Sequence, residues 1–258
     1  MSTSTATQSP IQLPPPSPSH LLSLLTDSAL PLSTFAFSSG LESRLSHPPL
    51  QPPNHSSTAT QSPTPKDPFT LPTFLNTTLY STSTLAVPFL LATHDNPTRA
   101  SELNAQYTAQ LLCPVQARAS LSQGRALRKI YNESILPLLP PDASGQLRPK
   151  LTVQEGWHIP IIWAYVCHCC GISRRDAAWG FLWGVAKGVV SAAVRLAVCG
   201  PFVGQRVLVE IGGAVEAGVE RGIKWEAEKG IGGCGMSWWG GEVVGGRQEI
   251  LYSRVFNS

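Results

Sequence analysis

The fold is decided by residues 159–199, which read IPIIWAYVCHCCGISRRDAAWGFLWGVAKGVVSAAVRLAVC. Residues 159–171 are almost entirely apolar and predict a buried helix. A second helix is expected over 173–199, because Ser173 and Asp176 have the spacing of a capping box and the Gly-Pro pair after residue 199 is a helix stop signal. The centre of the chain therefore predicts a helical core.

Helix signals also precede this centre. The leucines of 20–30 predict a short apolar helix that ends at Pro31. Apolar residues spaced by three and four between 70 and 94 indicate one or two helices, although the β-branched threonines there weaken the pattern. A further helix is expected to begin at Asn96, which has the character of an N-cap, with Pro97 in the first helical position.

Helix signals also occur just before and just after the central residues 159–199. An apolar stripe at 127–135 predicts another helix, closed by Pro137. The small residues Ser120 and Gly124 lie on the same side and would let a neighbouring helix approach closely. Downstream, one helix is expected near 202–222. No alternating pattern is long enough to build a sheet, so we expect an all-α, single-domain helical bundle.

Three stretches differ from this bundle. Residues 1–19 and 46–68 are rich in Ser, Thr and Pro, and they predict a disordered tail and a disordered insertion in a domain that spans 20–258. Residues 230–246 (GIGGCGMSWWGGEVVGG) predict a flexible loop, because the lysine-containing end of a phosphate loop is missing. The sequence lacks the charged region followed by an apolar run that marks a secretory signal, so we expect a cytoplasmic protein.

Charge is scarce, since 14% of the 258 residues are Asp, Glu, Lys or Arg, against about 25% in an average soluble protein. This excludes a charge-rich disordered chain and a coiled coil. The net charge of +3 is small and spread along the chain, so no nucleic-acid partner is expected. Nucleophile-elbow, zinc-hydrolase and kinase motifs are absent, which favours a binding protein over an enzyme.

Two other classes of protein stay open. Residues 177–199 are long enough to span a bilayer, but Lys187 and Arg195 each cost about 2.5–3.5 kcal/mol near its centre. A buried core helix is the simpler interpretation, without a membrane. Residues 167–170 (CHCC) suggest a Cys/His metal carrier, because thiolates and imidazoles are metal ligands. Adjacent residues on a helix point in different directions, so buried free thiols and no metal site are favoured.

Four separated blocks carry a resemblance to a known family. They read LLSLLTDSALP with FAFSSGLE (21–31, 35–42), ELNA with ARASLSQGRAL (102–105, 117–127), HIPIIW with SAAVRL and GPFVGQR (158–163, 191–196, 200–206), and EILYSRVFNS (249–258). In this order the blocks resemble the urease accessory protein UreF family.

The resemblance implies an all-helical, non-enzymatic chaperone that dimerises and helps to load nickel into apo-urease. The partners it implies are the accessory protein UreD, also called UreH, and the GTPase UreG. UreF proteins are thought to regulate this GTPase and to bridge it to UreD. Nickel is then the delivered ion, and no stably bound cofactor is expected.

The partner-binding residues that the resemblance implies fall in three groups. They are Asp27, Gly40 and Glu42 near the GTPase-facing surface, Gln205 and Arg206 after the Gly-Pro break, and Tyr252 and Arg254 in the tail that docks on UreD. Simpler local roles stay open for some of them. Asp27 could cap a helix, Glu42 could pair with Arg44 at the surface, and Arg206 could be a solvated charge.

The chain departs from the family pattern in three places. Ser33 and Thr34 stand where a glycine is common, and Gln248 stands where a histidine is usual. The glycine-rich 230–246 replaces a helical stretch, and each glycine costs up to about 1 kcal/mol in a helix. The segment before the tail is therefore where the resemblance is weakest.

Overall fold

The computed structural model describes residues 14–32, 37–47, 70–142, 145–152, 156–235, 243, 245–252 and 254–256. In these residues the chain forms helices and no β-strand, which confirms the predicted all-α class. The α-helices are α1 (Pro18–Leu25), α2 (Leu41–Ser46), α3 (Leu71–Asp95), α4 (Ala100–Gln110), α5 (Pro114–Ile130), α6 (Ile159–Cys169), α7 (Arg174–Arg195), α8 (Pro201–Glu210) and α9 (Gly212–Lys229). Shorter turns are the π-helical Tyr131–Ile135 and the 3-10 turns Pro97–Arg99, Leu136–Leu138, Ile231–Gly233 and Arg247–Ile250. The predictions of disorder for residues 1–13 and 48–68, and of a loop for 236–242 and 244, lie outside the described residues. Ser46, the first residue of the predicted insertion, is instead the last residue of α2.

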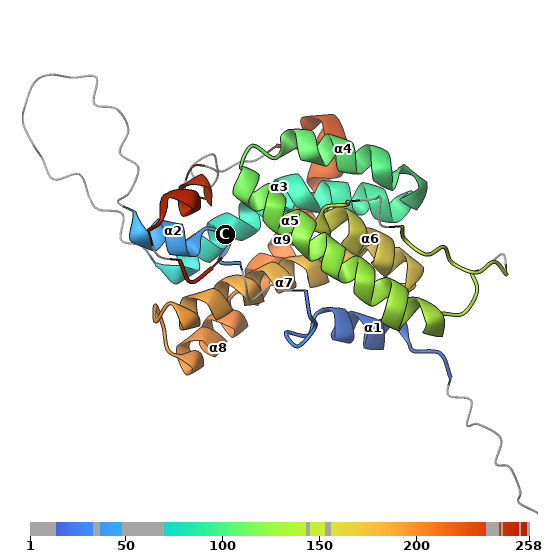
Figure 1. Ribbon diagram of the computed structural model, residues 1–258, viewed down its shortest axis with the longest axis horizontal. Helices are drawn as coiled ribbons and strands as arrows, with labels where there is room; N and C mark the ends of the chain where they lie inside the picture. The colour runs from blue at the N-terminus through green and yellow to red at the C-terminus, as the bar shows by residue number, and fades with distance from the viewer. Residues whose placement is uncertain are drawn as a thin grey trace, which may run out of the picture.

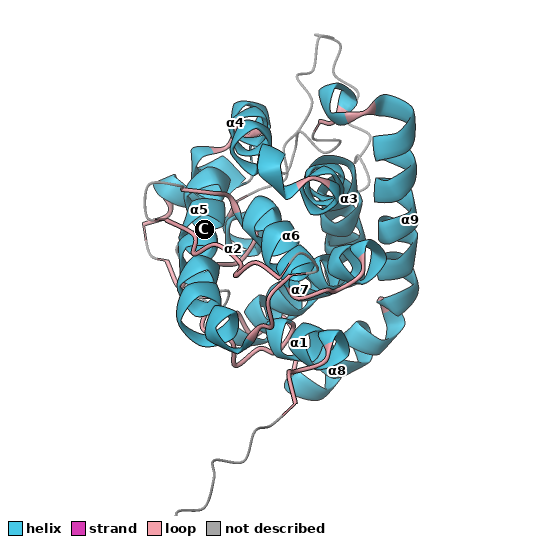
Figure 2. Ribbon diagram, turned by 90° about the vertical axis from the view of Figure 1, so that its right-hand side faces the viewer, coloured by secondary structure: helices cyan, strands magenta, loops and turns pink. Residues whose placement is uncertain are grey.

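Helix α3 is the centre of the bundle. It packs against α9, α6 and α7, and α5 packs on α6. Figure 1 shows α5 crossing in front of α6, and Figure 2 shows α9 running along one side of the bundle beside α3. Helix α7 contacts α3, α6, α8 and α9, so it joins the centre of the bundle to its periphery.

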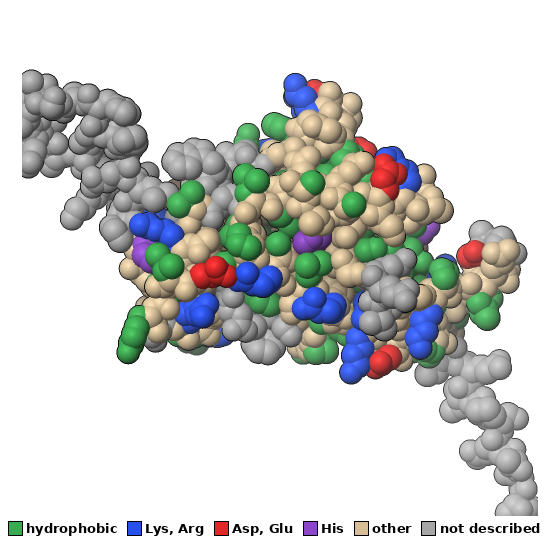
Figure 3. Space-filling view, turned by 45° about the horizontal axis from the view of Figure 1, so that its top comes forward, with side chains coloured by type: hydrophobic (Ala, Val, Ile, Leu, Met, Phe, Trp, Pro, Cys, Tyr) green, Lys and Arg blue, Asp and Glu red, His purple; other side chains and the backbone are tan. Residues whose placement is uncertain are grey.

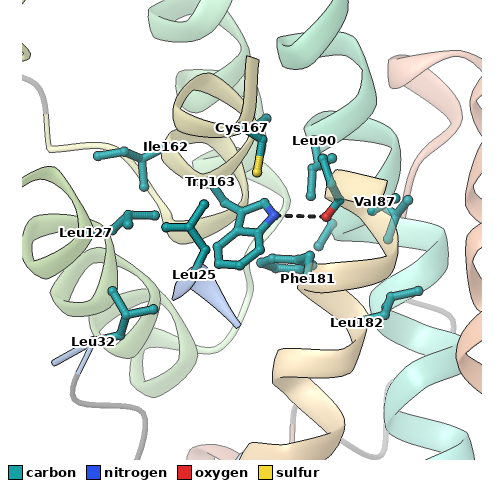
Figure 4. Close-up of a cluster of buried hydrophobic side chains, with 14 of the residues drawn as sticks. Leu25, Leu32, Val87, Leu90, Leu127, Ile162, Trp163, Cys167, Phe181 and Leu182 are labelled. Atoms are coloured by element: carbon teal, nitrogen blue, oxygen red, sulfur yellow. Dashed lines mark hydrogen bonds between the residues drawn. The ribbon is translucent and has the colours of Figure 1, made fainter. Parts of the chain in front are cut away.

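Helices α6 and α7 form the core that residues 159–199 predict. Residues 160–169 of α6 are all buried except His168. The Trp163 indole donates a hydrogen bond to the Ala177 carbonyl at 2.9 Å, which ties α6 to the first turn of α7. The Phe181 ring lies 6.1 Å from the Trp163 ring, inside a cluster of aliphatic side chains (Figure 4).

Helix α7 begins as predicted and ends earlier than predicted. The Ser173 hydroxyl donates to the Asp176 carboxylate at 2.6 Å and accepts from the Asp176 N–H at 3.1 Å, so Ser173 is confirmed as the N-cap. The helix stops at Arg195 rather than at residue 199. The reason is Ala197, which takes up the left-handed conformation with φ of 56° and closes the helix in a Schellman motif.

Helix α1 differs from the prediction at both ends. It begins at Pro18, so the last residues of the predicted tail belong to it, and Ser17 caps its first turn. It ends at Leu25 instead of residue 30, because the Asp27 carboxylate accepts a hydrogen bond from the Ala29 N–H at 2.8 Å and turns the chain.

The stretch from 70 to 94 lies in one helix, α3. Its threonines fit because the hydroxyls of Thr78 and Thr82 donate to carbonyls one turn back, at 2.9 and 2.8 Å. The helix expected to start at Asn96 begins as the 3-10 turn Pro97–Arg99 and continues as α4.

The single helix predicted near 202–222 is wrong, since this stretch forms two helices. The helix is interrupted at Ile211, between α8 and α9. Two glycines, which are poor helix formers, follow directly. Helix α8 therefore packs mainly on α7, and one of its faces is left exposed.

The close approach predicted beside α5 occurs, but it is made by the backbone that leads into α6 rather than by a helix. A Cβ atom placed on Gly124 would lie 2.0 Å from the Trp157 carbonyl oxygen. On the same face of α5, the Ser120 hydroxyl accepts a hydrogen bond from the Ile159 N–H at 3.1 Å. The apolar stripe at 127–135 is buried where it faces the core and continues past the end of α5 into the π-helical turn.

Helix α7 is long and apolar enough to cross a membrane by length and composition. In the bundle, 56% of its most apolar window is buried, against α3, α9 and α6. Burial lowers the pKa of Lys187 on this helix. This packing supports the interpretation of α7 as a core helix rather than a membrane span.

Candidate partner-binding surfaces

One buried side chain, Glu42, holds the carboxyl-terminal tail in place. Glu42 lies in the first turn of α2 and is 5% exposed. Its Oε1 atom accepts a hydrogen bond from the Val255 N–H at 2.6 Å. Its Oε2 atom accepts from the Phe256 N–H at 3.1 Å and from the Gln248 amide at 2.6 Å. Both oxygens of one carboxylate therefore bind the tail, an arrangement we call the Glu42 clasp.

Gln248 and Phe256 complete the clasp. Gln248 is fully buried, and its amide also donates to the Phe256 carbonyl at 3.2 Å. The Phe256 ring is buried, and the Arg195 guanidinium lies 4.1 Å from its centroid, in cation–π contact. At the edge of the tail, Glu249 forms an ion pair with Arg118 of α5. The tail is thus anchored to α2, α5 and the end of α7.

The clasp presents an apolar surface to solvent. Ile250, Tyr252 and Val255 are 71%, 107% and 60% exposed, and we call these three residues the tail surface. Arg254, among them in the sequence, is exposed too. A docking segment held in one shape before its partner arrives loses less conformational entropy on binding. The tail surface has this property, because the clasp holds the backbone from which it projects.

The other amino-terminal positions have different surroundings. Gly40 has φ of 81°, a left-handed conformation that favours glycine, and it starts the helix that carries Glu42. Asp27 is exposed and lies at the edge of a cavity of about 190 Å³ that Lys187 also lines. The structure thus groups Gly40 and Glu42 with Tyr252 and Arg254 of the tail, whereas Asp27 lies beside α7.

Helix α8 carries a second exposed apolar surface. Phe202 and Val209 are 89% and 83% exposed. The predicted contact residues Gln205 and Arg206 are exposed on the same helical face, between these two apolar side chains. Large exposed apolar side chains grouped on one face are typical of an interaction surface. We call Phe202, Gln205, Arg206 and Val209 the α8 stripe.

Comparison with known proteins decides the family. The UreF family model matches residues 66–212, which is more than half of the chain. The chain belongs to the UreF family. It is 29% identical over 247 residues to an uncharacterized urease accessory protein UreF-like of Schizosaccharomyces pombe, with 93% of this chain and 97% of that protein covered. It is 27% identical over 238 residues to urease accessory protein F of Arabidopsis thaliana (91% and 90% covered), and 25% identical over 178 residues to urease accessory protein UreF of Haemophilus influenzae (67% and 71% covered).

Membership of the UreF family implies a urease accessory protein and confirms the resemblance drawn from the four blocks. The stretch that the family model matches runs from before α3 to the start of α9, so it includes the α8 stripe. Glu42 precedes it and the tail follows it. The structure, rather than the family match, brings these two ends of the UreF chain together.

The described part of this UreF chain holds no group of three or more His, Cys, Asp or Glu side chains placed to bind a metal ion. Cys167, Cys169 and Cys170 are buried, and burial raises the pKa of all three thiols, that of Cys170 to about 12. His168 between them is exposed. Because the thiolate is the metal ligand, protonated thiols facing the core support buried free cysteines over a Cys/His carrier.

His158, the N-cap residue of α6, is a buried neutral imidazole. Its Nε2 atom lies 3.1 Å from the Thr108 hydroxyl, which itself donates to the Asn104 carbonyl. In the contact between His158 and Thr108, Nε2 is therefore the donor. Burial lowers the pKa of His158 to about 4, below the ordinary value of 6.5.

The buried His158 predicts a loss of stability in acid. Between pH 6.5 and 4 the unfolded chain binds a proton that the folded chain does not, so stability present above pH 6.5 is lost as the pH falls. From pH 7 to 5 we expect the free energy of unfolding to drop by about 2 kcal/mol from this residue. His158→Gln retains a donor for Thr108 and cannot titrate. Urea unfolding at both pH values should show a smaller drop for the variant, and equal drops would contradict the assignment.

Four residues of these surfaces are not predicted as contacts from the sequence. They are Gln248, Phe256, Phe202 and Val209. For the α8 stripe a signal exists, since Phe202 and Val209 are seven residues apart and fall on one helical face with Gln205 and Arg206. No local signal marks the clasp, because Gln248 and Glu42 are 206 positions apart.

Proposed function

We propose that this protein is the urease accessory chaperone that supports insertion of nickel into apo-urease in the cytoplasm. In this role it connects a UreD-type (UreH-type) accessory protein to a UreG-type GTPase, regulates that GTPase, and is not itself an enzyme. Nickel is its cargo rather than a bound cofactor. The single observation that best supports the proposal is the clasped tail, which offers a pre-formed apolar docking surface on a rigid helical bundle.

The proposal assigns the surfaces to partners. Tyr252 and Arg254 of the tail are the contacts for the UreD-type protein. Asp27, beside α7, is the contact proposed for the GTPase. Gly40 and Glu42 support binding by holding the tail, rather than by touching a partner themselves.

Complementation of a strain lacking UreF tests the proposed function, with urease activity as the readout. The wild-type chain should restore activity, and Tyr252→Ala should lower it strongly without loss of soluble protein, because Tyr252 is fully exposed and supports no fold contact. Leu24→Ala, at an exposed apolar residue of α1, is the matched control and should behave as wild type. A folded wild-type chain that restores no activity would contradict the proposal.

We also propose that the protein forms a homodimer through the α8 stripe. The four residues of the α8 stripe are placed symmetrically about the midpoint of α8, with apolar Phe202 opposite apolar Val209 and polar Gln205 opposite polar Arg206. Two copies of α8 packed antiparallel about a two-fold axis would therefore place each Phe202 on the partner's Val209. The same axis brings each Gln205 amide to the partner's Arg206 guanidinium. Such self-complementarity is what an interface between identical subunits requires.

Cross-linking tests this arrangement. In a Cys199→Ser background, chains with Phe202→Cys mixed with chains carrying Val209→Cys should form a disulfide-linked pair under mild oxidation, whereas neither variant alone should. Phe202→Glu should give a monomer of 27.7 kDa by light scattering, and Leu138→Glu, at another exposed leucine, should keep the wild-type mass. A wild-type chain that is monomeric at high concentration would refute the α8 dimer.

A further inference from the structure

The exposed face of α5 carries a row of cations. Arg118, Arg125 and Lys129 are seven and four residues apart, so they fall within an arc of about 40° around the helix axis. All three are exposed. Lys150, in the segment that runs beside the end of α5, adds a fourth exposed cation. We call these four residues the α5 row, and Lys and Arg side chains recur along this side of the molecule in Figure 3.

Most of the α5 row has no ion-pair partner among the described residues. There the side chains of Arg125, Lys129 and Lys150 make no hydrogen bond or ion pair. Arg125 and Lys129 are also a like-charge pair one helical turn apart, an arrangement that destabilises a helix by a few tenths of a kcal/mol. The part of the fold that the structure describes therefore holds these cations together without ion-pairing them.

Arg118, the first residue of the row, shows that a cation of the row can pair with a carboxylate. Arg118 forms an ion pair with Glu249, which immediately precedes Ile250 of the tail surface. The α5 row is thus continuous with the tail surface. A partner that covers Ile250 and Tyr252 would extend next over Arg125, about 10 Å further along the helix, and over Lys129 about 6 Å beyond it.

The neighbours of the row favour a protein over a nucleic acid. Leu138 and Leu147, close in sequence to its far end, are 66% and 84% exposed. The only aromatic residue between Arg118 and Lys150 is Tyr131, which is buried, so the row itself offers no ring for stacking on bases, and the exposed ring of Tyr252 belongs to the tail surface. Cations next to exposed leucines suit a protein surface that mixes carboxylates with apolar side chains.

We infer that the α5 row binds an acidic surface of the same partner that docks on the tail surface. This inference rests on the proposed function and adds the chemistry of the partner: carboxylate side chains positioned to pair with Arg125, Lys129 and Lys150. Because the cations are exposed, the pairing should depend on salt concentration and should act mainly on the rate of association.

The test compares two double charge reversals in binding to the co-expressed and purified UreD-type protein. Arg125→Glu with Lys129→Glu keeps a like-charge pair on α5 and puts a negative charge in its last turn, a cost of about 0.3–1 kcal/mol to the helix that the control below shares. It should weaken binding about tenfold or more at low salt. The difference should shrink as salt rises. Lys224→Glu with Lys229→Glu, at exposed positions of α9, is the control and should bind as wild type.

Tyr252→Ala is measured beside these variants. It separates the claim that the α5 row binds the partner from the claim of the proposed function. If Tyr252→Ala loses binding and the α5 reversal does not, the α5 row is overturned and the proposed function stands. If the UreD-type protein binds none of the chains, wild type included, the proposed function fails first. Binding of a single-stranded RNA to wild type, lost in the α5 reversal, would overturn the assignment to an acidic protein.

Discussion

Glu42→Gln is expected to release the carboxyl-terminal tail while leaving the helical bundle folded. A carboxylate accepts hydrogen bonds at both oxygens, and Glu42 uses both, toward Val255 on one side and toward Gln248 and Phe256 on the other. A glutamine offers one oxygen and turns an NH₂ group toward a donor at the other position. We expect the amides of Val255 and Phe256 to lose their protection from hydrogen exchange. The free energy of unfolding should fall by about 1–3 kcal/mol, because the released donors can reach water.

The same substitution should weaken binding of the UreD-type protein about tenfold or more, since the partner must then order a free tail, and tenfold corresponds to about 1.4 kcal/mol. Glu228→Gln, at an exposed glutamate of α9, is the control and should change neither exchange nor binding. Protected tail amides in Glu42→Gln would contradict the clasp, because they would show that other contacts hold the tail.

Gly124→Ala is expected to be among the most destabilising single substitutions in the bundle. The new methyl group would lie 2.0 Å from the Trp157 carbonyl oxygen, and backbone atoms cannot rotate away as a side chain can. We expect the free energy of unfolding to drop by about 3 kcal/mol, at the upper end of the usual cost of overpacking.

Gly184→Ala is the matched control for this prediction. Gly184 also lies inside a helix, α7, but a Cβ atom there meets nothing within 4 Å. The same substitution should therefore stabilise by up to about 1 kcal/mol, because alanine is the better helix former. Denaturant unfolding of the two variants should give shifts of opposite sign. Two shifts of the same sign and size would show that α5 does not pack on the backbone before α6.

Local patterns predict the parts of the fold that depend on neighbouring residues. The N-cap at Ser173 and the buried run of α6 are visible in the sequence and confirmed by the structure, and the close approach at Gly124 is confirmed with loop backbone in place of a helix. The end of α7 is not visible, because alanine is a good helix former and only the tertiary setting places Ala197 in the left-handed conformation. The break between α8 and α9 was likewise hidden by a continuous apolar pattern across it.

The candidate site shows the same division. The α8 stripe follows from the spacing of its residues along one helix. The clasp does not, because it joins residues near opposite ends of the chain, and a buried glutamate of α2 reads in the sequence as an ordinary surface charge beside Arg44. The resemblance to the UreF family marks Glu42 and the tail as important separately, and the structure supplies the hydrogen bonds between them.

The most direct test of the central claim, that this chain is an assembly protein of urease maturation, is its co-expression with the UreD-type and UreG-type proteins. Size-exclusion chromatography with light scattering would give the mass of what forms. We expect one complex that contains all three proteins, and we expect Glu42→Gln and Tyr252→Ala to elute apart from the UreD-type protein. A folded wild-type chain that elutes alone, with both candidate partners soluble and present in excess, would contradict the account.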